Sequence, residues 1–352
     1  MKKRFFVAML VLLCLLAGCK EEKTSEEIVE NEPAQSEVIP SVEEDPKKLP
    51  FQAPLTGLGS EHEINTRIIA VQINNHPLAR PQAGISFADV VYEMLVEGDA
   101  TRFLALYQSV VPENIGPVRS ARDYFVNLAK ELDAFYVAHG YSPGALAILN
   151  SGSVKHVNGM QYDGTYFKRS SNRKAPHNSY ITGENLLTVA EKLGVDLKQP
   201  QKTALSFYDS IEDVKVGNRA KMIQMNYYSS NSSSNSTYTY DEDTQTYLKA
   251  YGNKPLTDEL TNEQIAVSNV LFMEAPHKTI DSEGRREITL SQSGKAYVFQ
   301  AGIMREVNWV NKNGLLLAIE NDGSAVQLVP GKTWVHIVPT SPGLEKSVLY
   351  SE

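Results

Sequence analysis

Cysteine is nearly absent from this sequence, since only Cys14 and Cys19 occur among its 352 residues. Two cysteines exclude a disulfide-stabilised scaffold and a cysteine-rich zinc module. A surplus of positive charge is also missing, because 42 acidic residues outnumber 34 basic residues and the net charge is −8. A chain with this charge has no basic field over its whole surface, so nucleic acid is not expected among its partners.

The N-terminal apolar run is too short to cross a membrane as a helix. It covers residues 5–16 after a basic start, and its 12 residues fall short of the roughly 20 that a transmembrane helix needs. A basic start followed by a short apolar run is typical of a secretory signal peptide. The run ends in Leu16-Ala17-Gly18-Cys19, which resembles the lipobox that bacterial lipoprotein signal peptidase reads.

The resemblance to a lipobox implies a signal peptide over residues 1–18 that is cleaved before Cys19. It also implies lipidation at Cys19, with diacylglycerol on the sulfur and often a further acyl chain on the new amino group. Two or more acyl chains give stable membrane attachment. We therefore expect a protein anchored by lipid to the extracytoplasmic face of the cell membrane. The mature chain would have no free thiol, because Cys14 leaves with the signal peptide.

The segment after the lipidation site has the composition of a disordered tether, which we expect over residues 19–54. Residues 20–50 contain ten acidic residues against four lysines, with four prolines and few large apolar side chains. Such a segment cannot bury a hydrophobic core. As a random coil it would span about 30 Å, which is enough to hold a folded body away from the membrane surface.

Two folded domains of different character are predicted after the tether. Residues 55–200 alternate strand and helix patterns and predict an α/β domain with a mixed sheet. Residues 201–352 contain short apolar runs separated by glycines, which predict a β-rich domain. The fold class is therefore α/β or α+β. In the first domain the predicted strands are 68–73, 90–96, 103–111 and 135–139, and the predicted helices begin near Ser120, Ser142 and Thr182.

Several segments of the folded part carry a family resemblance in combination. They are Ile73–Gln82, Ala88–Glu93, Val96–Phe103, Gly116–Arg122, Ala138–Gly140 and Gly331–Trp334. Together they resemble the YerB-like lipoprotein family, a domain of unknown function. The resemblance implies an N-terminal and a C-terminal domain, and it brings no catalytic residues to carry over.

The hairpin around residues 97–100 holds the first group of candidate site residues. Residues two apart on a strand share a face, so Glu93 and Glu97 are expected to point together. A hairpin loop of two or four residues would place Arg102 on that face, opposite Leu95 or Glu97. With Asp99 in the turn, this face could bind a polar ligand or a cation, or supply the acid and base of a glycan hydrolase. The alternative is a cross-strand ion pair on a solvated surface.

Cationic side chains form the second group of candidates. Arg119 and Arg122 lie at the start of a predicted helix, where arginine and free backbone N–H groups can bind an anion. The loop 161–179 is rich in basic residues, and Lys168, Arg169 and His177 are its candidates for contact with an anionic partner. The alternative for the two arginines is structural, with one of them paired to Asp123 or Glu97 and the other exposed. The alternative for the basic cluster is a solvated loop.

Catalytic and metal motifs are weak elsewhere in the sequence. Gly140–Gly144 matches G-x-S-x-G, but Pro143 follows the serine and has no N–H to donate to an oxyanion, so Ser142 is predicted to be a helix cap. The histidines lack the spacing of metal ligands, and no metal or cofactor is expected. His139, at the end of a predicted strand, is the histidine that we consider as a catalytic candidate.

The sequence favours a binding module over an enzyme. The expected partners are the membrane, through the lipid anchor, and an anionic envelope polymer or an envelope protein. One alternative is a cell-wall glycan hydrolase that uses Glu93, Glu97 or Asp99. A second alternative is a solute-binding lipoprotein, which would need two matched α/β lobes around a cleft.

Overall fold

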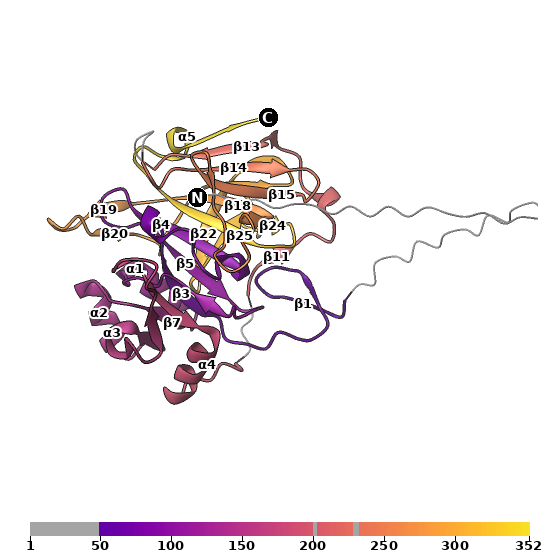
Figure 1. Cartoon of the computed structure of the whole chain (residues 1–352). Coiled ribbons are helices and arrows are strands. Elements are labelled where there is room, and N and C mark those ends of the chain that lie inside the picture. Colours follow the sequence, from indigo (N-terminus) through magenta and orange to yellow (C-terminus); the bar gives the residue numbers. More distant parts are fainter. Residues whose placement is uncertain (1–48, 200–202, 228–231) are drawn as a thin grey trace, which may run out of the picture. The chain divides into compact units, whose positions relative to one another are not determined.

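The computed structural model describes residues 49–199, 203–227 and 232–352 (Figure 1). Cys19, the predicted signal peptide and most of the predicted tether lie outside the described residues. Within these ranges no helix has both the length and the apolar character needed to cross a membrane.

One mixed sheet of eleven strands takes its strands from both predicted domains. Its centre is the parallel pair β25 and β4, where Trp334 lies opposite Val91. The order is β12 (Asn218–Arg219), β22 (Ile303–Lys312), β21 (Ser293–Gln300), β18 (Asn269–Ala275), β25 (Thr333–Pro339), β4 (Val90–Leu95), β5 (Thr101–Tyr107), β3 (Ile69–Asn74), β7 (Phe135–Ala138) and β8 (His156–Asn158), with β23 (Leu315–Ile319) paired to β22. The central strands are buried on both faces, which explains their nearly continuous apolar sequences.

A second sheet of six strands packs against one face of the first. Tyr238 and Tyr247 of this sheet share a buried core with Phe272 and Trp334 of the large sheet. Figure 1 shows its strands β13, β14 and β15 stacked beside β18 and β25. The order is β16 (Lys254–Pro255), β15 (Thr246–Tyr251), β14 (Ser236–Asp241), β13 (Met222–Met225) and β26 (Val348–Ser351), with β17 (Ala266–Val267) paired to β15.

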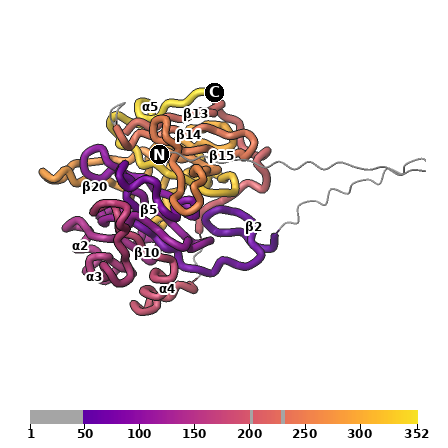
Figure 2. Tube along the Cα trace, viewed as in Figure 1, coloured from indigo at the N-terminus to yellow at the C-terminus, as the bar shows by residue number. Residues whose placement is uncertain are grey.

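Helices cover the sheet in its N-terminal part. Phe125 and Leu128 of α1 belong to the core on the opposite face, together with Leu104 of β5. Figure 2 shows α2, α3 and α4 gathered in the part of the chain that is coloured magenta. The helices are α1 (Asp123–Glu131), α2 (Pro143–Asn150), α3 (Gly159–Tyr162), α4 (Gly183–Lys192) and α5 (Leu344–Ser347), with 3-10 turns η1 (Pro77–Ala79), η2 (Ile85–Phe87) and η3 (Ile211–Asp213).

Smaller strand pairs complete the described fold. They are β1 (Phe51–Gln52) with β2 (Gly59–Ser60), β6 (Asn114–Ile115) with β10 (Ser179–Thr182) and β9 (Phe167–Arg169), β11 (Ser206–Phe207) with β24 (Gln327–Leu328), and β19 (His277–Thr279) with β20 (Arg286–Ile288). The fold class predicted from the sequence is confirmed: helices and a mixed sheet come first, and the rest of the chain is rich in strands. The domain boundary at residue 200 stays a prediction.

The start of α1 differs from the predicted cap. The helix begins at Asp123 and Arg122 is its N-cap residue, without a side-chain capping bond. Ser120 instead donates a hydrogen bond to the carbonyl oxygen of His139 (3.2 Å). The cap at Ser142 is confirmed, because its Oγ accepts from the N–H of Ala145 (3.2 Å) and donates to Asp123 (2.7 Å). Tertiary contacts therefore replaced the local cap predicted at Ser120.

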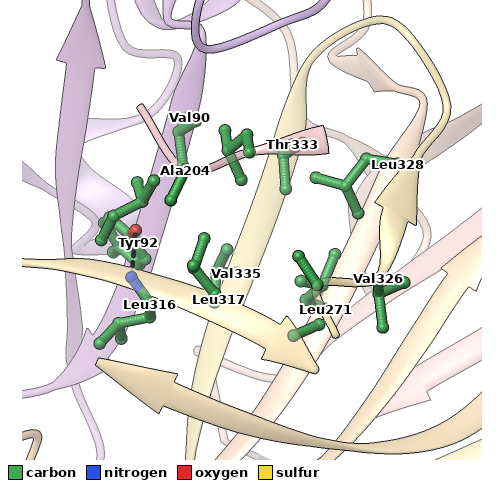
Figure 3. A pocket seen from close by; sticks show the side chains of 14 residues that line it. Val90, Tyr92, Ala204, Leu271, Leu316, Leu317, Val326, Leu328, Thr333 and Val335 are labelled. Atoms are coloured by element: carbon green, nitrogen blue, oxygen red, sulfur yellow. Dashed lines mark hydrogen bonds between the residues drawn. The ribbon is translucent and has the colours of Figure 1, made fainter. Parts of the chain in front are cut away.

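A small cavity lies against the large sheet, between β4, β23 and β25 (Figure 3). Its volume is about 20 Å³, and aliphatic side chains such as Leu271, Leu317 and Val335 form most of its wall. The Tyr92 hydroxyl accepts a hydrogen bond from the N–H of Leu316 (3.3 Å). An apolar cavity of this size is a packing void, too small for an organic ligand.

Candidate functional site

Most of the site residues predicted from the sequence lie at one edge of the large sheet. Strands β4, β3, β7 and β8 run in the same direction. Both β4 and β3 are antiparallel to β5, β7 is parallel to β3, and β8 is parallel to β7. Their carboxyl ends therefore meet at this edge, where open α/β sheets bind their ligands. Glu97 follows β4, His139 follows β7, and Arg102 lies at the start of β5.

The hairpin register that we predicted for Arg102 is wrong. Arg102 lies opposite Met94, and Glu93 lies opposite Phe103. The connecting segment covers 96–100, closed by a hydrogen bond from the N–H of Val96 to the carbonyl of Ala100 (2.8 Å). This loop has an odd number of residues, whereas both predicted loops were even, so Arg102 faces the other side of the sheet.

In the observed register, the carboxylates that a glycan hydrolase would need on one face of the hairpin are separated. Glu93 is completely buried inside the sheet packing. Glu97 lies outside the strand, with its carboxylate 2.5 Å from Arg122 and 3.5 Å from Arg102. Asp99 is exposed in the turn. The shared carboxylate face predicted for this hairpin is therefore absent.

Glu97 acts as a counter-ion for two arginines. Burial raises the pKa of Glu97, but Arg122 and Arg102 outweigh it and hold the pKa below its ordinary value. Arg102 is 6% exposed, and burial together with Arg122 lowers its pKa to about 9. Its Nη1 also donates to the carbonyl of Ser120 (2.6 Å). The pair Arg102 and Arg122 is thus fixed in place, and Glu97 stays ionised near neutral pH.

Arg119 is a cation without a counter-ion of its own. Its backbone N–H donates to the carbonyl of Gln72 (2.8 Å), which places it beside the end of β3. The side chain is half-buried, and within the described part of the chain its guanidinium makes no hydrogen bond or ion pair. Burial and the nearby charges of Arg122 and Arg169 lower its pKa, against the opposing effect of Glu97. Among the described residues this guanidinium is thus unpaired, with the charges of Arg122, Arg169 and Glu97 acting on it.

His139 brings the basic loop to the same edge. Nη2 of Arg169 lies 2.9 Å from Nε2 of His139, and Oγ of Ser179 lies 2.7 Å from Nδ1. Arginine can only donate, so Nε2 accepts and the proton of a neutral imidazole is on Nδ1, donated to Ser179. Burial and Arg169 lower the pKa of His139, in agreement with this neutral form. Arg169 also pairs with Asp163 (2.8 Å).

The other two candidates of the basic loop differ in position. His177 accepts a hydrogen bond from the side-chain amide of Asn74 (2.9 Å) and stacks on His76, with ring centroids 4.4 Å apart. Burial, His76 and Arg119 lower the pKa of His177, so it lies within the field of Arg119. Lys168 is exposed and donates to the carbonyl of Gly164 within its own loop (2.6 Å).

We call the resulting set the arginine cluster: Arg102, Arg119, Arg122, Arg169 and His139, with Glu97 and Asp163 as counter-ions. Four guanidinium groups face two carboxylates, which leaves a local excess of positive charge on an acidic protein. A guanidinium binds carboxylate or phosphate through two parallel N–H groups. Among the described residues no group of three or more His, Cys, Asp or Glu side chains is arranged to hold a metal ion.

A second polar group, which the sequence analysis missed, surrounds Glu93 in the core. Its Oε2 lies 3.2 Å from Nζ of Lys249 and accepts from the indole N–H of Trp334 (3.0 Å). Its Oε1 accepts from Asn75, Thr101 and Tyr251. The rings of Tyr238, Tyr251 and Trp334 surround the Lys249 ammonium at 4.3, 5.0 and 4.6 Å.

His336 completes this buried network as a neutral imidazole. The Tyr227 hydroxyl donates to the backbone carbonyl of Glu93, so Nδ1 of His336 must donate to Tyr227 (3.0 Å). Nε2 then accepts from Tyr238 (2.7 Å), whose oxygen accepts from Lys249 (2.6 Å). Burial and the Lys249 charge hold the pKa of His336 well below its ordinary value.

A sequence signal for this network exists in the strand patterns. Lys249 lies between Tyr247 and Tyr251 on the inward face of β15, where an unpaired lysine would be costly. His336 interrupts the otherwise apolar centre of β25. Both positions point to buried partners, although the sequence does not name them.

The comparisons with known proteins agree with this architecture. The chain matches the two domains of a family described as "Protein of unknown function (DUF3048)". The N-terminal domain of the family matches residues 55–196, and its C-terminal domain matches residues 223–335. The chain is 43% identical over 294 residues to "Putative lipoprotein YerB" of Bacillus subtilis (strain 168), covering 83% of this chain and 87% of the relative. It is also similar to the crystal structure of the YerB protein from Bacillus subtilis, with a TM-score of 0.79 and 40% identity, covering 86% of this chain and 100% of that one. The chain therefore belongs to the YerB-like DUF3048 family.

Proposed function

We propose that this protein is a lipoprotein anchored at Cys19 on the extracytoplasmic face of the membrane, and that its arginine cluster binds an anionic envelope polymer. The lipobox at residues 16–19 and the name of the Bacillus relative support the anchor. The observation that carries the binding role is the half-buried guanidinium of Arg119, which has no partner in the described part of the chain. An arginine left in this state is available to an anion from outside.

The geometry around Arg119 favours phosphate or carboxylate groups. The charges of Arg122 and Arg169 act on Arg119, and both of these arginines are already held by counter-ions, so their positions are fixed before a ligand arrives. Fixed donors lose little conformational entropy on binding. Each hydrogen bond between charged groups contributes about 1.5–3 kcal/mol. A polymer with repeated anionic groups would meet this site from solvent at the sheet edge.

The alternatives have less support. An envelope protein with exposed acidic side chains would use the same chemistry, and it remains the second candidate partner. A glycan hydrolase needs two carboxyl groups in one cleft, but Glu93 is buried beside Lys249 and Glu97 is paired with Arg122. A solute-binding lipoprotein needs two lobes around a cleft, but strands from both halves of this chain form one sheet.

Co-sedimentation with cell-wall fragments tests the proposal. The mature protein, kept in mild detergent, would be mixed with fragments that carry their anionic polymer and with fragments from which it was extracted. We expect retention on the first and loss on the second, and a strong reduction for Arg119→Gln. Lys130→Gln, an exposed position on α1 with the same loss of charge, should be retained like the wild type. Equal retention of Arg119→Gln and wild type would contradict the proposal.

A further inference from the structure

A pocket lies where the two family regions meet, apart from the arginine cluster. Its volume is about 290 Å³, close to the lower limit for small-molecule sites. The N-terminal region contributes the turn around η1, and the C-terminal region contributes the end of β15 and the segment after it. The lining residues are Pro77, Arg80, Pro81, Tyr251, Lys254, Pro255, Leu256 and Thr257.

Arg80 is held rigidly in the wall of this pocket. Its Nε and Nη2 donate to Asn75 at 3.0 and 2.9 Å, and Nη2 also donates to the carbonyl of Ser233 (2.9 Å). The guanidinium carbon lies 3.5 Å from the ring centroid of Tyr251, so one face of the guanidinium is stacked. Nη1 makes no hydrogen bond in the described residues, and the guanidinium therefore keeps N–H groups available.

The pocket also has a single sign of charge. Lys254 is exposed at the pocket and has no hydrogen bond or ion pair within the described part of the chain. Among the residues that the structure describes, no carboxylate lines the pocket, and the remaining wall consists mainly of three prolines, Tyr251 and Leu256. Two cations beside flat apolar surfaces are complementary to an anion with a flat apolar body.

We propose that this pocket binds a small aromatic carboxylate. The carboxylate would be bound by Nη1 of Arg80 and the ammonium of Lys254, and the ring would lie against the prolines and Leu256. The walls are preorganised, because Arg173 donates to the carbonyls of Ala79 and Pro81 at 2.5 and 2.6 Å. Tyr251 is fixed as well, since its hydroxyl donates to the buried carboxylate of Glu93 (3.2 Å). Binding to such a site requires little ordering of the protein.

Fluorine NMR with two matched probes tests this site on the mature protein. The probes are 4-fluorobenzoate and the neutral 4-fluorobenzyl alcohol, and the readout is line broadening during titration with protein. We expect saturable binding of the benzoate and binding of the alcohol weaker by about ten-fold. Lys254→Gln should raise the Kd for benzoate roughly three-fold, and Lys278→Gln, an exposed lysine of β19, should leave it unchanged.

The outcomes separate this site from the arginine cluster. Arg80→Lys keeps the charge but removes the planar fork, and should raise the Kd at least about five-fold. If Arg80→Lys lowers the melting temperature, its Kd no longer reports on the pocket alone. Lys254→Gln then tests the site, because the exposed Lys254 side chain can be replaced without disturbing the fold. Absence of benzoate binding, equal binding of both probes, or benzoate binding that is lost in Arg119→Gln would each overturn the proposal.

Discussion

Glu93 and Lys249 form an ion pair of 3.2 Å in which neither side chain is exposed to solvent. The pair links β4, from the N-terminal region, to β15, from the C-terminal region. Burial lowers the pKa of Lys249 to about 8, against the opposing effect of Glu93. The hydrogen bonds from Asn75, Thr101 and Trp334 satisfy the rest of the Glu93 carboxylate. This connection holds the two sheets together, and it adjoins the pocket beside Arg80, because Tyr251 in the pocket wall donates a hydrogen bond to Glu93.

Loss of the Lys249 ammonium should strongly destabilise the fold. Lys249→Met leaves the Glu93 carboxylate buried without its cation, and removing one partner of such a pair costs about 3–5 kcal/mol. We expect the free energy of unfolding, measured by urea titration, to fall by about 3 kcal/mol.

Two variants control this experiment. Lys215 pairs with Glu320 and its side chain is 56% exposed. Lys215→Met should therefore lower the free energy of unfolding by about 1 kcal/mol or less. The double variant Glu93→Gln and Lys249→Met should recover part of the loss, because no unpaired charge remains. A loss for Lys249→Met as small as that for Lys215→Met would contradict the role assigned to the pair.

Anion affinity at the arginine cluster should rise as the pH falls. Burial and Arg169 hold the pKa of His139 below 6.5 in the free protein. A bound anion stabilises the imidazolium and raises the pKa of His139. At a pH between the pKa of the free protein and that of the complex, His139 therefore takes up a proton when the anion binds. Glu97 and Asp163 have lowered pKa values and stay ionised there. Between about pH 7.5 and about pH 5.5, the Kd for polyphosphate should fall by up to about ten-fold.

The histidine variant identifies the group that titrates. His139→Gln should flatten the pH dependence, and the slope that remains would come from His177, whose pKa is also lowered. An affinity that falls toward acidic pH, or an unchanged slope in His139→Gln, would be inconsistent with this arrangement.

Gly159 gives a steric test of the position of His139. A Cβ at residue 159 would lie 2.3 Å from Nδ1 of the imidazole, so Gly159→Ala must displace the ring from its bond to Ser179. We expect a loss of about 1–3 kcal/mol in unfolding free energy and weaker anion binding. In a His139→Ala background the same glycine substitution should cost little. If Gly159→Ala lowers the unfolding free energy by a similar amount in both backgrounds, the imidazole does not lie against residue 159.

Lipidation at Cys19 is tested by metabolic labelling. A fatty-acid probe should label the wild-type protein, and Cys19→Ser should abolish the label and release the protein from the membrane fraction. Labelling that persists in Cys19→Ser would contradict the assignment of the anchor.

Local signals explain what the sequence could predict. The strands at 68–73 and 90–96 are short apolar runs between turn residues, and the structure has β3 and β4 there. Ser142 followed by Pro143 is a local start signal, and α2 begins at that point. Arg119 and Arg122 were indicated by their charge and by their place at the start of a predicted helix, and the basic loop by its charge.

The errors arise where tertiary contacts decide the conformation. The 96–100 loop has an odd number of residues, which places Arg102 on the opposite face from the one predicted. The sequence does not determine whether this number is odd or even. Ser120 bonds to His139 across the sheet edge instead of capping α1. The Glu93 network joins residues from β4, β15 and β25, so no local pattern could assign Lys249 to Glu93.

Calorimetric titration with polyphosphate measures the central claim most directly. The wild-type protein should bind it with saturation, and Arg119→Gln should raise the Kd about ten-fold, as expected for one lost charge-assisted hydrogen bond. Lys130→Gln, with the same change in net charge, should stay within about two-fold of the wild type. If Arg119→Gln and the wild type bind polyphosphate with the same Kd, the arginine cluster is not the anion site.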